Sequence, residues 1–135
     1  DLLKSTKNSR IINMSSASSL YGTAHLAVYS ATKSAVSSLT ESLNLEFGRY
    51  KIYVTDVRAP YVETPLLEQT TRAPSINKLG INLTPDDVAR VVYRATAGKK
   101  IHHDTKGIKQ LQILLMIPIP LFIKTKILKI LLLEN

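Results

Sequence analysis

The stretch AVYSATKSAVSSLTESLNLEF, residues 27–47, lies between two short segments that are rich in isoleucine and valine. Its apolar residues recur at intervals of three and four positions, at Val28, Ala31, Ala35, Val36, Leu39, Leu43 and Phe47. This period predicts a long helix from about Val28 to Phe47. Gly48 follows at a position that is typical of a helix C-cap.

Strands are predicted on both sides of this helix. RIINMSS, residues 10–16, is apolar and then serine-rich, as in a buried parallel strand that ends at a polar edge. KIYVTDVRA, residues 51–59, is rich in β-branched residues and is stopped by Pro60.

A second helix and a third strand are predicted further along the chain. TPDDVARVVYRATAG, residues 84–98, has Thr84 as a candidate N-cap and Pro85 in the first turn. KKIHHDT, residues 99–105, would be the third strand. Strand, helix, strand, helix, strand is the order typical of an α/β parallel sheet with right-handed crossovers.

Polar residues fall at one edge of this expected sheet. Ser15 and Ser16 end the first strand, Tyr29 and Lys33 begin the following helix, and APYVETP, residues 59–65, begins where the second strand ends. Ligands of open α/β sheets bind beyond the carboxyl ends of the strands. The pattern therefore predicts a hydroxyl, a phenol and an ammonium around one small space.

Tyr29 and Lys33 are four residues apart, so on a helix they share one face. A phenol ionises near pH 10 and is a poor base at pH 7, but a cation within about 4–6 Å shifts such a pKa by one to three units. Tyr29 would then take a proton from an alcohol or give one to a ketone, while Ser16 holds the substrate oxygen. The alternative is an ordinary surface pair.

Ser16, Tyr29 and Lys33, together with the segments IINMSS and IYVTDVRAPYVETP, resemble the short-chain dehydrogenase/reductase family over roughly residues 10–67. The resemblance implies the C-terminal, catalytic half of an α/β, Rossmann-like doubly wound parallel sheet. It implies Ser16 as the substrate-orienting residue, Tyr29 as the acid/base, and Lys33 as its partner and ribose ligand. The residues that resemble cofactor-binding positions are Tyr29, Lys33, Pro60, Val62 and Thr64. The implied reaction is hydride transfer between NAD or NADP and an alcohol or ketone.

Two features depart from that family's pattern. Tyr61 follows Pro60 where the family usually has glycine, and the five glycines of the chain are isolated, so no glycine-rich phosphate loop can be built from them. We therefore expect that the front half of the enzyme precedes Asp1. The alternative is a truncated, non-catalytic remnant that serves as a binding or interaction module.

Composition narrows the class of protein. The chain has 135 residues, enough for one domain, and no cysteine, which excludes disulfide scaffolds and thiolate metal sites. His102 and His103 are adjacent in an expected strand and would point to opposite faces, so no metal site is predicted. The start of the chain has no secretory pattern, which favours a cytoplasmic protein. The resemblance implies a small-molecule substrate and a homo-oligomer.

Much of the formal net charge of +8 lies near the C-terminus. Seven lysines and two acidic residues after residue 98 supply +5 of it. This part of the chain has no arginine and one aromatic residue, Phe122, which argues against nucleic-acid binding.

The C-terminal tail is strongly apolar, but Pro118 and Pro120 interrupt it too early for a membrane span. LFIKTKILKILLL, residues 121–133, would be a terminal helix over a substrate cleft or partner subunit. The alternative is a basic amphipathic helix at a membrane surface. We assign residues 1–107 to the Rossmann-type domain and residues 108–135 to an apolar, lysine-containing extension.

Overall fold

The computed structural model describes residues 1–65, 67, 76, 83–106 and 120–132. Its elements in chain order are α1 (Leu2–Ser5), β1 (Arg10–Met14), the 3₁₀ turn η1 (Ala17–Ser19), α2 (Ala27–Gly48), β2 (Tyr53–Arg58), α5 (Pro85–Ala95), β3 (His102–Asp104) and α7 (Leu121–Leu132). Within the described residues, the strands form one parallel sheet in the order β1-β2-β3. The predicted α/β class and all three strands are confirmed.

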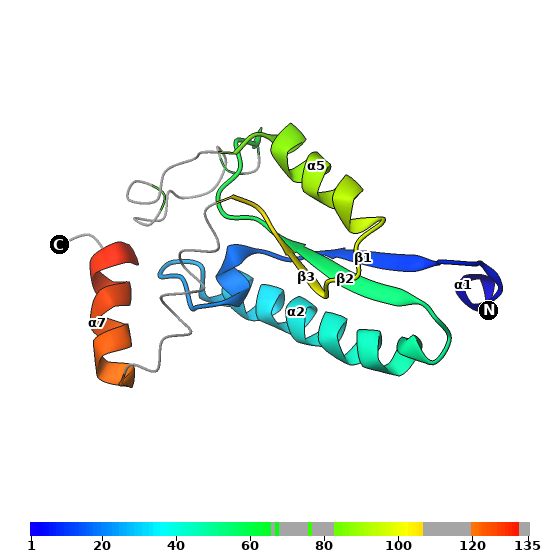
Figure 1. Ribbon diagram of the computed structural model, residues 1–135. Helices are drawn as coiled ribbons and strands as arrows, with labels where there is room; N and C mark the ends of the chain where they lie inside the picture. The colour runs from blue at the N-terminus through cyan, green and yellow to red at the C-terminus, as the bar shows by residue number, and fades with distance from the viewer. Residues whose placement is uncertain (66, 68–75, 77–82, 107–119, 133–135) are drawn as a thin grey trace.

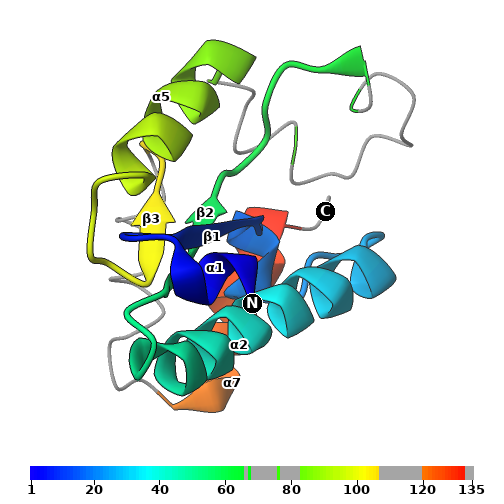
Figure 2. The ribbon, with the colours of Figure 1, turned by 90° about the vertical axis from the view of Figure 1, so that its right-hand side faces the viewer.

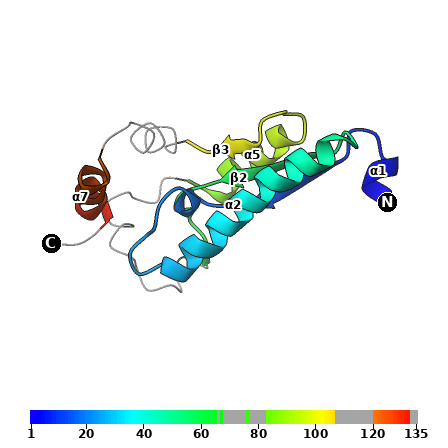
Figure 3. The same ribbon diagram turned by 90° about the horizontal axis from the view of Figure 1, so that it is seen from below.

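Helices cover both faces of this sheet. Figure 1 shows α2 on one face and α5 on the other, and Figures 2 and 3 show the same arrangement from two further sides. Both connections step in the same direction across the sheet. The crossover from β1 to β2 passes through α2 on one face, and the crossover from β2 to β3 passes through α5 on the other face. Two crossovers that move in the same direction over opposite faces of a sheet have opposite handedness. The prediction that both are right-handed is therefore wrong for one of them.

The long helix α2 is confirmed, but its apolar stripe does not form its buried face. The helix buries three polar residues against the sheet and the neighbouring loop, Ser30, Ser37 and Thr40. Four residues of the apolar stripe face outward instead, Val28, Ala31, Ala35 and Leu39.

Hydrogen bonds explain this orientation of α2. Ser37 Oγ donates to Asp56 Oδ2 at 3.0 Å, and Asn13 Nδ2 donates to Thr40 Oγ1 at 2.9 Å. The sheet face beneath α2 therefore carries polar side chains from β1 and β2. Buried polar groups need partners, and the serines and threonines of α2 supply them.

The apolar core lies on the opposite face, between the sheet and α5. Val57, Val91 and Ala95 form a buried cluster, against which Ile12, Val88 and Val92 pack. The predicted start of α5 is confirmed, because Thr84 is its N-cap and Pro85 its first residue.

The turn after α2 differs from the prediction. The helix continues through Gly48, and its C-cap is Arg49 in a right-handed conformation. The residue with left-handed backbone is Lys51, at φ 58°. The assignment of Gly48 as the C-cap is wrong, since the chain reverses three residues later.

The helix predicted in the tail is present as α7, which lies beyond the carboxyl ends of the strands and apart from the sheet (Figures 1 and 3). Among the described residues, no helix is long and apolar enough to cross a membrane. The predicted boundary between residues 107 and 108 lies outside the described residues and stays a prediction.

Candidate active site

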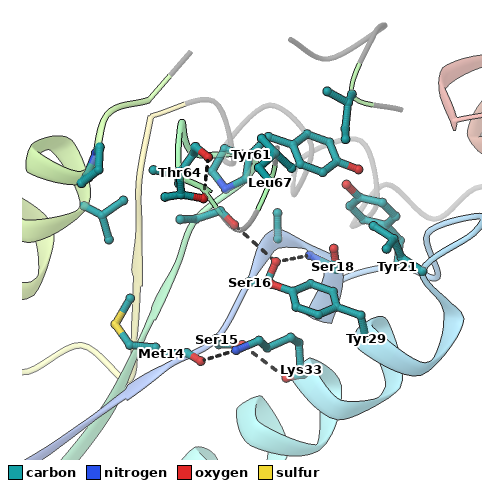
Figure 4. Close-up of a pocket in the computed structure, with 18 residues that line it drawn as sticks. Met14, Ser15, Ser16, Ser18, Tyr21, Tyr29, Lys33, Tyr61, Thr64 and Leu67 are labelled. Carbon is teal, nitrogen blue, oxygen red and sulfur yellow. Dashed lines mark hydrogen bonds between the residues drawn. The ribbon is translucent and has the colours of Figure 1, made fainter. Parts of the chain in front are cut away.

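A pocket of about 500 Å³ opens at the carboxyl edge of the sheet. Its described walls come from the end of β1, from the loop before α2 and the first turns of that helix, and from the segment after β2 (Figure 4). All six residues predicted from the sequence line it, namely Ser16, Tyr29, Lys33, Pro60, Val62 and Thr64.

Ser16 is held in place where β1 ends. Its Oγ accepts a hydrogen bond from Ser18 N at 3.2 Å, which caps η1, and donates a long one to Ala59 O at 3.4 Å. The backbone N–H of Ala17 bonds to Ala59 O at 2.9 Å and extends the pairing of the strands beyond the sheet. Ser16 is thus a buried hydroxyl on a rigid support.

Tyr29 and Lys33 project from the first turns of α2 toward the same pocket. Lys33 Nζ donates to Met14 O at 3.0 Å and lies 5.6 Å from the centroid of the Tyr29 ring. Ser15 Oγ bonds to Lys33 O at 3.3 Å and ties the helix to the end of β1. Tyr29 is 42% exposed, and its hydroxyl end points toward Ser16 in Figure 4.

The segment after β2 forms another wall. Val62 pairs with Leu83 in a parallel bridge, and Glu63 N donates to Leu83 O at 2.9 Å. Thr64 Oγ1 bonds back to Val62 O at 3.4 Å. Residues that are far apart in the sequence therefore surround one cavity, with a hydroxyl, a phenol and an ammonium on one side of it.

Comparison with known proteins identifies the family of this chain. The family model for short chain dehydrogenases matches residues 1–75, more than half of the chain.

The chain belongs to the short chain dehydrogenase family.

Curated relatives support this assignment over part of their length. A fatty acyl-CoA reductase of Acinetobacter baylyi is 32% identical over 89 residues, which cover 66% of this chain and 29% of the relative. Dehydrogenase/reductase SDR family member 6 of Rattus norvegicus is 44% identical over 68 residues, which cover 50% of this chain and 28% of the relative. The chain thus spans less than a third of the length of these relatives.

Solved structures give the same fold. A short chain dehydrogenase from Burkholderia cenocepacia in complex with NADP has a TM-score of 0.73 at 17% identity, over 93% of this chain and 48% of that chain. A 3-ketoacyl-(acyl-carrier-protein) reductase from Brucella melitensis complexed with NADH has a TM-score of 0.61 at 31% identity. The match covers 73% of this chain and 44% of that chain. The three-stranded sheet and its flanking helices are therefore part of the dehydrogenase fold.

The structure also adds residues to the pocket of this member of the short chain dehydrogenase family that the sequence did not indicate. Tyr21, Leu26, Leu67, Ile76 and Val88 contribute to its described walls. Tyr21 and Leu26 lie between η1 and α2, Leu67 and Ile76 lie in helical turns after β2, and Val88 lies on the apolar face of α5. No local signal in the sequence marks these residues as the lining of a pocket. Only their position around the cavity reveals them.

Proposed function

We propose that the protein is a nicotinamide-dependent oxidoreductase that interconverts an alcohol and a ketone, with NAD or NADP as cofactor. The observation that carries this proposal is the convergence of Ser16, Tyr29 and Lys33 on one pocket at the carboxyl edge of a parallel sheet. The solved relatives bound to NADP and NADH support it.

The pocket offers groups that suit a nicotinamide nucleotide. Pro60 and Val62 provide apolar surface beside the hydroxyl of Thr64. The Lys33 ammonium has three N–H donors, of which Met14 O accepts one, so it keeps donors for ribose hydroxyls. When bound, the cofactor supplies the hydride chemistry, and these residues would hold it.

In this proposal, Tyr29 and Ser16 form hydrogen bonds with the substrate oxygen. A carbonyl oxygen between the two hydroxyls would accept a hydrogen bond from each. The bond from Ser16 Oγ to Ala59 O is long at 3.4 Å, so Ser16 can turn its proton to the substrate at little cost. Tyr29 would then give its proton to the developing alkoxide, or take one from an alcohol in the reverse direction. The Lys33 charge stabilises the negative charge that this transfer leaves on the phenol oxygen.

Replacing Tyr29 with phenylalanine tests this role. The Tyr29→Phe variant keeps the ring but loses the proton donor, so we expect kcat to fall by about 10²–10⁴-fold in the intact protein. Turnover is followed by the absorbance of the reduced nicotinamide, with a panel of simple ketones and alcohols. Thermal unfolding should be almost unchanged, because the hydroxyl is at the surface of a pocket.

Tyr50→Phe is the matched control. Tyr50 is an exposed tyrosine in the turn between α2 and β2, so its hydroxyl should not affect kcat. A Tyr29→Phe variant that turned over at the wild-type rate would remove Tyr29 from the mechanism.

A further inference from the structure

Two tyrosines form an aromatic wall beside Ser16 and Tyr29 in the pocket. Tyr21 follows η1, and Tyr61 follows β2, so they reach the pocket from different parts of the chain. In Figure 4 their hydroxyl ends point toward one another. The described lining of the pocket also includes the apolar side chains of Leu26, Leu67 and Ile76.

The described lining of the pocket carries little charge. Lys33 is its only formally charged side chain among the described residues, and Met14 O accepts one of its donors. Burial and the neighbouring Tyr61 raise the pKa of Tyr21 to about 12, although a hydrogen bond with Thr23 acts in the opposite direction. The Tyr21 hydroxyl therefore stays neutral at physiological pH.

We infer that this pocket selects an uncharged, largely apolar ketone or secondary alcohol, such as an alicyclic one, and that Tyr21 and Tyr61 determine this specificity. The inference rests on the proposed function and names its substrate class. An apolar ring gains free energy by contact with aromatic and aliphatic side chains. A carboxylate in the same place would lose its hydration, which is costly. The single cation of the described lining, Lys33, already donates to Met14 O and in the proposed function also holds the ribose hydroxyls.

A matched pair of ketones tests the preference. 4-Methylcyclohexanone and 4-oxocyclohexanecarboxylate differ by a methyl and a carboxylate group at the same position. With the intact protein and NADH or NADPH, we expect kcat/KM for the methyl ketone to exceed that for the carboxylate by at least about 100-fold. Binding without turnover is measured by isothermal titration calorimetry.

Substitutions at the aromatic wall should change this preference. Tyr21→Ala should lower kcat/KM for the methyl ketone about tenfold, as expected for lost apolar contact. Tyr21→Arg should raise kcat/KM for the carboxylate at least tenfold. Tyr93→Ala, at an exposed position on α5, is the control and should leave both values unchanged.

The possible outcomes separate the two proposals. Equal kcat/KM and equal binding for the two ketones would overturn the inference and leave the proposed function standing. Turnover of neither ketone, with selective binding of the methyl ketone, would overturn the proposed function and support the specificity of the wall. Tyr21→Ala and Tyr61→Ala variants that folded and kept wild-type selectivity would remove these tyrosines from the inference.

Discussion

At the scale of single residues, Asp56 is the most enclosed charged group of the described structure. Its side chain is 0% exposed at the centre of β2. Ser37 Oγ donates to Oδ2 at 3.0 Å, and His102 Nδ1 lies 2.9 Å from Oδ1. His102 Nε2 in turn lies 3.1 Å from Glu41 Oε1. This network joins α2, β2 and β3, and it satisfies a carboxylate that would otherwise be costly to bury.

The two adjacent histidines point to opposite faces, as their positions in a strand predict. His102 faces the carboxylates on the α2 side, whereas His103 lies against Gly98, on the α5 side of the sheet. The hydrogen bond to Asp56 raises the pKa of His102 above its ordinary 6.5. Burial lowers the pKa of His103 below the same value.

These opposite shifts predict a stability optimum near pH 6.5. The folded state holds the His102 proton more tightly than the unfolded state. The contribution of His102 to the unfolding free energy is therefore complete below pH 6.5 and is lost as pH rises through the pKa of His102 in the folded state. For His103, the contribution is complete above pH 6.5 and is lost as pH falls through the folded pKa. Denaturant unfolding at a series of pH values measures the decline in unfolding free energy on each side of pH 6.5.

The variant His102→Gln should remove the decline in unfolding free energy above pH 6.5 and keep the decline below it. His103→Gln provides the reciprocal control, because it should remove only the decline in unfolding free energy below pH 6.5. An unchanged alkaline decline in His102→Gln would show that another group causes it.

At the scale of one element, α5 has a complete N-terminal cap. Thr84 Oγ1 accepts from Asp87 N at 3.3 Å, and Asp87 Oδ2 accepts from Thr84 N at 2.9 Å. The hydrogen bond from the Thr84 backbone, followed by the one from Arg90, lowers the pKa of Asp87 to about 2. The capping box thus keeps its negative charge at the positive end of the helix dipole.

Thr84→Ala should lower the unfolding free energy by about 1 kcal/mol, since it removes the N-cap acceptor. Denaturant unfolding followed by circular dichroism measures the change. Thr84→Ser keeps the hydroxyl and should stay within a few tenths of a kcal/mol of wild type. A loss as large in Thr84→Ser as in Thr84→Ala would mean that the Thr84 methyl group, and not the cap, stabilises α5.

At the scale of the whole molecule, α2 leaves an apolar surface on the outside. Val28 is 79% exposed and Leu39 is 53% exposed, and Ala31 and Ala35 lie between them on the same face. A stripe of this kind suits a second copy of the same helix, because small residues at its centre let two helices approach closely. We therefore expect the homo-oligomer that the family resemblance implies to form through α2.

Leu39→Asp should weaken self-association of the intact protein, because it places a charge in the middle of this stripe. Analytical ultracentrifugation at several protein concentrations measures the effect, and we expect the dissociation constant to rise at least tenfold. Ala89→Asp adds the same charge at an exposed position on α5, on the opposite side of the sheet, and should change nothing. Equal association of Leu39→Asp and wild type would exclude this face as the interface.

The sequence by itself determined the three strands, the helices α2, α5 and α7, and the order of these elements. The apolar period of α2, the β-branched runs of β1 and β2, and the cap at Thr84 are local signals, because each depends on residues within a few positions of one another. The residues of the candidate site could also be predicted from the sequence. Ser16, Tyr29 and Lys33 stand at the ends and starts of elements whose place in a parallel sheet follows from general topology.

Only the tertiary structure decided which side of each element is buried. Four of the seven stripe residues that predict α2 face outward, because Asn13 and Asp56 come from distant strands and require the hydroxyls of the helix. Likewise, Tyr21 and Tyr61 share a pocket only after η1 and β2 have been brought to one edge. The physical reason is the same in each case: burial and hydrogen-bond partners depend on residues far away in the chain, which a local pattern does not contain.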